Sequence, residues 1–228
     1  MEMKKLLNVV ESLLIIGLIL YVLVYGVKTD IDVIVNDVTP ERTDFPLSSI
    51  VFVEAAAGWS GSAILIDEDT LLTAGHIVNG CLGINIRPDD ESDYYAVADG
   101  FYVYPFDAAI IHSKSKLTNT PIRIGKSSNL KIGETVYIIG YPFGVSTDIV
   151  TKGTVSGKGE RYGGFFGDID LITVDAPSWP GNSGGAVIND AGELVGILVG
   201  SIRNYDSHSI VIPIDSLNLK ETLNETKL

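Results

Sequence analysis

The sequence predicts an all-β fold, of the sandwich or barrel type, behind one N-terminal transmembrane helix. Three observations support the β prediction. Short apolar runs recur after residue 45, separated by Gly, Asn, Asp or Pro, which is typical of antiparallel strands joined by turns. The stretch AVINDAGELVGILV (186–199) predicts a hairpin of two apolar strands around a turn. A softer polar segment near 114–131 divides the apolar runs into two groups of similar size, which indicates two β-barrels.

The expected strands are short and apolar or alternating. They are Ile50–Val53, Ser62–Ile66, Leu71–Thr73, Ala108–Ile111, Thr135–Ile139, Leu171–Val174, Ala186–Ile188, Leu194–Val199 and Ser209–Ile212. After them, the stretch IPIDSLNL predicts the start of a short helix with Asp215 or Ser216 as its cap.

The N-terminal segment is expected to anchor the chain in a membrane. Residues 6–27 are strongly apolar, and about 20 such residues cross a bilayer. Two lysines precede the span and two aspartates follow it, so the positive-inside tendency places residues 1–5 in the cytoplasm and the remainder outside. Residues 28–45 are then a polar linker, and residues 218–228 form a C-terminal tail.

Two alternatives to the anchor stay open. A cleaved signal peptide would give a secreted protein, but Val24-Tyr25-Gly26 is a weak match to a cleavage site. A buried soluble helix is disfavoured because the apolar residues occupy all sides of the segment rather than one stripe.

The charge composition of the chain argues against some classes of binding partner. The formal net charge is −13, from 16 basic and 29 acidic residues. Such an acidic chain is not expected to bind nucleic acid or anionic lipid heads. The single cysteine, Cys81, excludes an intrachain disulfide, so a domain outside the cytoplasm must be stable without one. We interpret Cys81 as a small buried hydrophobe.

The candidate acid–base residues are few. Of three histidines, His76 lies in LLTAGHIV at the end of an apolar strand, His112 ends another apolar run and His208 lies in a polar loop. Asp107 stands among apolar residues in YPFDAAIIH, where a buried carboxylate needs a partner. Taken singly, His76 is more often structural, and Asp107 more often caps a turn.

A serine in a glycine-rich turn makes a catalytic role for His76 and Asp107 more plausible than either residue does alone. Ser183 lies in PGNSGG directly before an apolar run. To act as a nucleophile, a serine needs an imidazole to take its proton and a third group to orient that imidazole. His76 and Asp107 are the residues available for these roles. Gly181, without a Cβ, is free to aim its N–H at a developing oxyanion, and the Ser183 N–H is the second candidate donor.

Several segments together resemble a known family. TAGH, FDAAI and PGNSGG follow one another in the order of the chymotrypsin-like serine proteases. SGSAILIDEDTLLTAGHIV, IGYPFGVSTDIVTKGTVSG and TVDAPSWPGNSGGAVIND are similar to segments of the HtrA/Deg branch. The resemblance covers roughly residues 48–217. It implies two six-stranded antiparallel barrels in a trypsin-like peptidase domain, 46–217, with the first barrel at 46–120 and the second at 130–217.

The resemblance also implies roles for single residues. His76 is expected to be the general base, Asp107 its orienting carboxylate, and Ser183 the nucleophile that forms an acyl-enzyme. The N–H groups of Gly181 and Ser183 are expected to form the oxyanion hole. No metal or cofactor is expected, because the chain has no zinc-ligand spacing and no phosphate-binding loop.

The same resemblance implies specificity and assembly. Leu198 and Val199 lie on the strand expected to border the primary specificity pocket, where apolar side chains favour cleavage after aliphatic residues. The expected partners are protein or peptide substrates, misfolded ones included, and a homotrimer is expected by analogy. The chain ends soon after its last expected strand, so no PDZ domain is expected.

Two other functions are weighed against a membrane-anchored serine endopeptidase. The first is a catalytically silent protease fold that binds unfolded chains or a partner, as a chaperone or scaffold. The intact His76, Asp107 and Ser183 argue against it. The second is a structural module on a membrane anchor. The presence of TAGH, FDAAI and PGNSGG in the order of the protease family argues against it.

Overall fold

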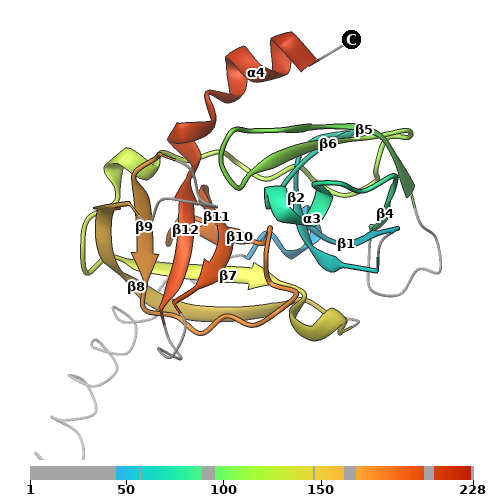
Figure 1. Ribbon diagram of the computed structural model, residues 1–228. Helices are drawn as coiled ribbons and strands as arrows, with labels where there is room; N and C mark the ends of the chain where they lie inside the picture. The colour runs from blue at the N-terminus through green and yellow to red at the C-terminus, as the bar shows by residue number, and fades with distance from the viewer. Residues whose placement is uncertain are drawn as a thin grey trace, which may run out of the picture. The chain divides into compact units, whose positions relative to one another are not determined.

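The structure, a computed structural model, describes residues 45–226 apart from residues 57, 89–95, 146, 162–167 and 203–207. The strands of these residues form two closed six-stranded barrels (Figure 1), and the strand pairs within each barrel are antiparallel. The predictions of an all-β fold and of two barrels are confirmed. Both barrels belong to one compact unit, Asp44–Leu228.

The first barrel has the strand order β1-β2-β3-β6-β5-β4 and closes where β4 pairs with β1. Closure leaves no unpaired sheet edge for another chain to extend. Its strands are β1 (Ile50–Ala55), β2 (Ser60–Asp67), β3 (Thr70–Thr73), β4 (Ile84–Arg87), β5 (Ala96–Val103) and β6 (Ala109–Ser113).

The second barrel has the order β10-β11-β12-β9-β8-β7 and closes where β7 pairs with β10. The predicted hairpin is confirmed as the β10–β11 pair. Its strands are β7 (Thr135–Gly140), β8 (Ile149–Glu160), β9 (Leu171–Val174), β10 (Ala186–Ile188), β11 (Leu194–Ser201) and β12 (Ser209–Pro213).

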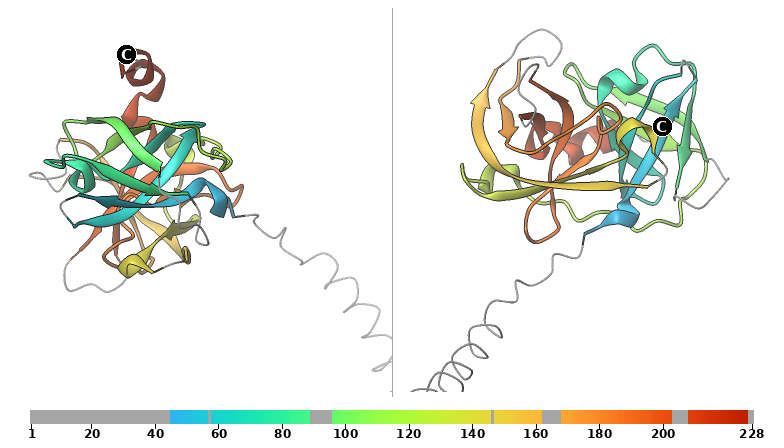
Figure 2. Two further views of the ribbon diagram at one scale, coloured as in Figure 1. Left: turned by 90° about the vertical axis from the view of Figure 1, so that its right-hand side faces the viewer. Right: turned by 90° about the horizontal axis from the view of Figure 1, so that it is seen from below.

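Apolar packing holds the two barrels together. One cluster of buried side chains contains residues of both barrels, among them Leu72 and Ile110 of the first and Ile139 and Ile197 of the second. A separate cluster, which includes Val136 and Ile138, belongs to the second barrel. Because the larger cluster crosses from one barrel to the other, burial of its apolar surface fixes the barrels against each other. Figure 2 shows them side by side.

Three strands of the structure are absent from the sequence prediction. These are β4, β5 and β8, which no expected strand covers. In β5 only Ala96 is buried, and β8 is mostly exposed along its 12 residues. These two strands have no continuous buried face and so show no apolar alternation to detect, whereas β4 alternates the buried Ile84 and Ile86 with polar residues but is only four residues long. β8 continues through the glycine-containing residues Gly157–Glu160, where the sequence shows no apolar run.

The helices are short. They are α3 (Gly75–Val78), α4 (Leu219–Thr226) and the 3₁₀ helices η2 (Leu47–Ser49), η3 (Ser127–Asn129), η4 (Pro142–Gly144) and η6 (Ile214–Leu217). The predicted C-terminal helix is present, but the predicted cap is wrong. Asp215 and Ser216 both lie inside η6, and no side chain caps this helix. The predicted C-terminal tail, residues 218–228, contains α4 (Figure 1).

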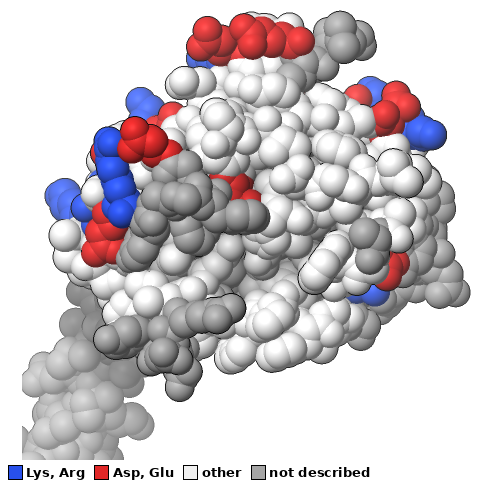
Figure 3. Space-filling model, viewed as in Figure 1, with Lys and Arg blue, Asp and Glu red and all other residues white. Residues whose placement is uncertain are grey.

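The predicted membrane anchor at residues 6–27 lies outside the described residues, as do the cytoplasmic stub and the linker up to residue 44. No helix in the part of the chain that the structure describes has the length and apolarity to cross a membrane. On the face of the barrels seen in Figure 3, the charged side chains lie mainly at the periphery and over α4, and the middle of the face carries few of them.

The Asp215 carboxylate joins the C-terminal end of the fold to the connection between the barrels. Its Oδ2 accepts the N–H of Ser128 at 2.8 Å, and the Asp215 N–H donates to Ser127 Oγ at 3.2 Å. Burial acts to raise the pKa of Asp215. The hydrogen bonds from Ser128 and Ser127, with Lys126 nearby, outweigh burial and hold the pKa below its ordinary value.

We predict that this contact makes stability depend on pH. A depressed carboxyl pKa contributes stability above the unfolded value, about 4, which is lost as pH falls through the folded pKa. Asp215→Asn is therefore expected to unfold more easily than the wild type at pH 6, by less than about 1 kcal/mol because the group is largely exposed. The difference should vanish towards pH 2. Urea unfolding across this range measures it, with Asp175→Asn as control, and a constant difference would contradict the prediction.

Candidate active site

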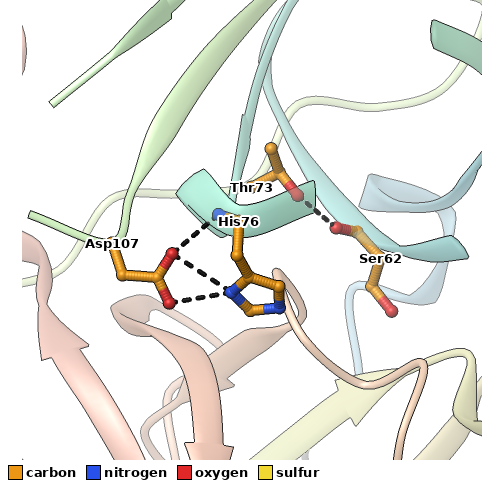
Figure 4. A network of polar contacts seen from close by, with 4 residues as sticks. All are labelled: Ser62, Thr73, His76 and Asp107. Carbon is orange, nitrogen blue, oxygen red and sulfur yellow. Dashed lines mark hydrogen bonds and ion pairs between the residues drawn. The ribbon is translucent and has the colours of Figure 1, made fainter. Parts of the chain in front are cut away.

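His76 and Asp107 form a hydrogen-bonded pair in the first barrel. His76 Nδ1 lies 2.8 Å from Asp107 Oδ2 and 3.1 Å from Oδ1, and the His76 backbone N–H donates to Oδ1 at 2.7 Å (Figure 4). The Asp107 side chain is 1% exposed and that of His76 is 29% exposed. A carboxylate on Nδ1 favours the tautomer that carries its proton there, which leaves a lone pair on Nε2.

The end of β3 sets the position of His76. The strand stops at Thr73, and α3 begins at Gly75. His76 therefore lies on a one-turn helix after the strand, not at the strand end as predicted. A Cβ on Gly75 would lie 3.1 Å from the N atom of Ala108 and 3.2 Å from Asp107 Oδ1. Glycine thus lets the helix approach the carboxylate closely.

The strand ladder sets the position of Asp107. Strands β3 and β6 pair with Thr73 opposite Ala109, so the residues just after β3 and just before β6 lie at the same end of the pair. Asp107 precedes β6 by two residues and His76 follows β3 by three. The register brings the two side chains together although 31 positions separate them in the sequence.

Ser183 lies in a turn of the second barrel, Gly181–Gly185, called the serine turn below. Its carbonyl accepts the N–H of Ser62 in β2 at 2.8 Å. A Cβ on Gly61 would lie 2.9 Å from the Ser183 carbonyl oxygen and 2.8 Å from Ile77 Cδ1. Since Ile77 directly follows His76, these contacts place the serine turn beside α3.

Gly184 makes the closest approach between the serine turn and the first barrel. Its φ is +85°, in the region that favours glycine. A Cβ there would overlap the carbonyl oxygen of Ser62 and Thr73 Oγ1, and would lie 3.0 Å from the N atom of Ala74. The serine turn therefore packs against the chain two residues before His76.

His76, Asp107 and Ser183 therefore lie in the same region of the fold, but they are held there by different contacts. His76 and Asp107 are bonded to each other, and the backbone of Ser183 is bonded to β2. Within the described part of the chain, the Ser183 hydroxyl makes no hydrogen bond. Catalytic hydrogen bonds are often long without substrate and tighten when it binds.

Gly181 has both of its peptide planes held. Its φ is +98°. The carbonyl of Pro180, on one side, accepts the N–H of Phe143 at 2.6 Å, and the carbonyl of Gly181 accepts Ser62 Oγ–H at 2.9 Å. Neither the Gly181 N–H nor the Ser183 N–H donates a hydrogen bond to a described residue. Two backbone donors are therefore available at the serine turn.

Leu198 and Val199 are in β11 as expected, but both are buried. Leu198 is 1% exposed within the second-barrel cluster, and Val199 is 4% exposed within the larger cluster. The Leu198 carbonyl accepts the N–H of Gly184 at 2.7 Å, and its N–H donates to Gly185 at 3.0 Å. The backbone of Leu198 thus fastens the serine turn to β11, while its side chain packs in the core.

The described residues contain no group of three or more His, Cys, Asp or Glu placed to hold a metal ion. Cys81 is partly buried, and its Sγ–H points at the Ile77 carbonyl at 3.4 Å. His112 lies in β6, with Nδ1 3.5 Å from Thr70 Oγ1.

Ser62, which bonds to both Gly181 and Ser183, carries no functional motif in the sequence. It lies within SGSAILID at the start of β2. The only sequence signal is a polar residue between Gly61 and an apolar run. Its partners lie about 120 positions further along the chain, so its contacts are visible only in the folded structure.

Comparison with known proteins gives the family of the chain. The family described as "Trypsin-like peptidase domain" matches residues 61–197, which is more than half of the chain. The chain belongs to this family. The matched region includes all three residues of the candidate site and the whole serine turn.

The trypsin-like peptidase domain is similar to HtrA and DegP proteins. It is 35% identical over 170 residues to "Serine protease HtrA-like" of Staphylococcus haemolyticus, covering 69% of this chain and 26% of that protein. It is 36% identical over 164 residues to "Probable periplasmic serine endoprotease DegP-like" of Pseudomonas savastanoi, covering 68% of this chain and 32% of that protein. The chain thus spans between a quarter and a third of the length of these relatives.

Solved structures give the same result for the fold. "HtrA-type protease AlgW with tripeptide" superposes with a TM-score of 0.70 and 27% identity over 79% of this chain and 61% of that chain. An M. tuberculosis protease in its active form superposes with a TM-score of 0.69 and 21% identity over 78% of this chain and 81% of that chain. The second likeness concerns the fold alone.

We predict that Gly184→Ala separates the serine turn from the first barrel. The new methyl group would meet Ser62 and Thr73, in addition to the cost of a positive φ, so unfolding should become easier by about 3 kcal/mol or more. Gly80→Ala is the control, since Gly80 also has a positive φ, +76°, but has no heavy atom within 4 Å of the Cβ position. The control should lose only about 1–2 kcal/mol. Equal losses in urea unfolding would contradict the packing described.

Proposed function

We propose that this chain is a membrane-anchored serine endopeptidase in which Ser183, His76 and Asp107 form a catalytic triad. The observation that carries the proposal is the hydrogen bond between the buried Asp107 and the partly exposed His76, with the serine turn packed close to the residues before and after His76. The family membership and the protease names of the relatives support the same activity.

The proposed reaction begins with Ser183. His76 Nε2 takes the proton of the Ser183 hydroxyl as its Oγ bonds to the carbonyl carbon of the scissile peptide. Asp107, bonded to Nδ1, holds the ring in position and stabilises the imidazolium that forms. The C–N bond then breaks, and His76 gives the proton to the departing amine, which leaves an acyl-enzyme on Ser183.

Water completes the cycle. His76 takes a proton from the water, whose oxygen attacks the acyl carbon, and the proton returns to Ser183 Oγ as the acid product leaves. In both halves the carbonyl oxygen becomes an oxyanion. We assign its stabilisation to the N–H groups of Gly181 and Ser183, because both donors are unused among the described residues.

The substrates we propose are polypeptides with apolar side chains, as in misfolded proteins. Two exposed aromatic residues adjoin the serine turn: Phe143 is 67% exposed and Trp179 is 41% exposed, with ring centroids 6.2 Å apart. Exposed aromatic surface beside a site favours an apolar ligand. An aliphatic preference through Leu198 and Val199 has weaker support, since both side chains are buried.

We propose that the peptidase domain lies outside the cytoplasm on the 6–27 anchor. The apolar length and the flanking charges of that segment support the anchor, and the DegP-like relatives are named periplasmic. A cleaved signal peptide with a secreted domain is the alternative. The homotrimer implied by the resemblance stays a prediction.

We predict that Ser183 reacts with a fluorophosphonate probe. The purified full-length wild type in detergent should be labelled, and Ser183→Ala should not, because the probe traps only an activated serine. Heat-denatured wild type is the control for nonspecific labelling. No labelling of folded wild type would contradict the proposed activity and favour a silent protease fold that binds its partners.

We predict that Asp107→Asn retains the fold and loses turnover. The amide cannot hold the Nδ1–H tautomer, and the expected loss in kcat is about 10⁴-fold. Cleavage of fluorescent casein measures it, with thermal unfolding to show that the variant is folded. Asp168→Asn is the matched control, because Asp168 is exposed and pairs with Arg161 on the surface. A loss of tenfold or less would contradict the role given to Asp107.

A further inference from the structure

Phe143, in η4, has a backbone conformation that its side chain disfavours. Its φ is +58° and its ψ is 16°. Among the residues that the structure describes, only Phe143 and Asn218 combine a positive φ with a side chain larger than that of glycine. Asparagine tolerates this left-handed region, whereas a bulky residue is an outlier there. Such backbone strain persists where the surrounding structure fixes it, and it is concentrated at functional sites.

The residues around the serine turn hold Phe143 in this conformation. The Phe143 N–H donates to the Pro180 carbonyl at 2.6 Å. A Cβ on Gly181 would lie 2.8 Å from the N atom of Phe143 and 2.5 Å from the Tyr141 carbonyl oxygen. The backbone of η4 therefore lies directly against the serine turn, and the position of Phe143 is fixed relative to it.

The backbone contact accounts for the conformation of Phe143 but not for its aromatic side chain. The group that bonds to Pro180 is a backbone N–H, which every residue except proline supplies. Glycine or asparagine would supply it at this φ with less steric cost. The Phe143 side chain is 67% exposed, so it is not a core residue. An exposed ring at a strained position therefore calls for a role outside the folded core.

Trp179 lies beside Phe143 and is also fixed by its backbone. It directly precedes Pro180, and its carbonyl accepts the N–H of Asn182 at 3.0 Å. Its side chain is 41% exposed, and the two ring centroids are 6.2 Å apart with an angle of 37° between the rings. Phe143 and Trp179, called the aromatic pair below, thus form an exposed apolar surface on a fixed backbone. A surface fixed in this way loses little conformational freedom when a ligand binds.

The aromatic pair lies close to the place where the scissile bond is expected. In the proposed reaction the carbonyl oxygen of that bond lies about 3 Å from the Gly181 N–H. Trp179 precedes Gly181 by two residues, and Phe143 contacts Gly181 through its backbone. An extended polypeptide advances about 3.3 Å per residue. A substrate side chain within about three residues of the scissile bond can therefore reach the aromatic pair.

We propose that Phe143 and Trp179 form a specificity subsite, which takes one apolar substrate side chain within about three residues of the scissile bond. This inference rests on the proposed function and deepens it, because it names the residues that select the substrate. The strain at Phe143 costs the folded protein free energy. It is offset only in the complex, where the substrate side chain covers the ring and removes its apolar surface from water.

The test removes the Phe143 ring and keeps the backbone conformation. Phe143→Asn in the full-length chain replaces the ring with a residue that accepts a positive φ. Ile132→Asn is the matched control. Ile132 is also 67% exposed, and it precedes β7 by three residues, as Phe143 follows β7 by three. The control therefore removes an equally exposed apolar side chain at the opposite end of the same strand.

The substrates for the test come from the protein's own cleavage of casein. Mass spectrometry of a digest by the wild type locates the cleavage sites, and a peptide spanning the strongest site is synthesised. In further peptides, each apolar residue within three positions of the scissile bond is replaced by serine, one at a time. The kcat and KM of each enzyme on each peptide then form double-mutant cycles. Thermal unfolding of each variant and fluorophosphonate labelling of the wild type are measured as well.

The wild type is expected to prefer the parent peptide over one of the serine-containing peptides by about tenfold in kcat/KM, the value of one covered apolar side chain. Phe143→Asn should remove this preference through a higher KM at unchanged kcat, because it removes a binding contact away from the reacting atoms. Trp179→Ala should weaken the preference at the same peptide position, and Ile132→Asn should keep it. The melting temperature of Phe143→Asn should equal or exceed that of the wild type, because the strain is relieved. If Phe143→Asn does not fold, Phe143→Gly takes its place.

Three results would overturn the proposal. If the wild type is active but shows no apolar preference, or Phe143→Asn keeps that preference at every position, the aromatic pair is no subsite and the proposed function stands. If Phe143→Asn lowers kcat equally on all peptides, Phe143 acts through its bond to Pro180 and does not select the substrate. If folded wild type is neither labelled nor active on casein, the proposed function fails and the substrate subsite fails with it.

Discussion

The contact between the serine turn and β2 is the constraint on which the site depends. The triad proposed here takes His76 and Asp107 from one barrel and Ser183 from the other. Hydrogen bonds inside the first barrel hold His76 and Asp107, but only packing between barrels brings Ser183 to them. That packing needs two close approaches, at Gly61 and Gly184, where any Cβ would meet the opposite backbone or side chain.

The two halves of the site are consequently held by different forces. The Asp107–His76 pair is polar, with Asp107 buried and His76 partly exposed, and its position follows from the β3–β6 register. The serine turn is held by backbone hydrogen bonds to Ser62 and Leu198 and by the apolar cluster common to both barrels. The hydrogen bonds of such a site orient its polar groups, but burial of apolar surface supplies most of the free energy of folding. The site therefore depends on the apolar cluster around it.

Strands buried at every residue could be predicted from the sequence, because they leave a continuous apolar run. Strands β3, β9 and β10 are buried at every residue, and their apolar runs are plain in the sequence. Strands β5 and β8 are mostly exposed and gave no such signal. His76 was expected at a strand end, because nothing in LLTAGHIV distinguishes the last residues of a strand from one turn of helix.

The sequence by itself determined the all-β class, the two barrels and the three candidate residues, because these depend on local patterns: apolar runs, turn residues and short motifs. The tertiary structure decided which groups meet. The bond between His76 and Asp107, the burial of Leu198 and the contact of Ser62 with Gly181 join positions 31 to 119 residues apart or depend on the packed core. Such contacts arise from strand register and barrel packing, which no local stretch of sequence encodes.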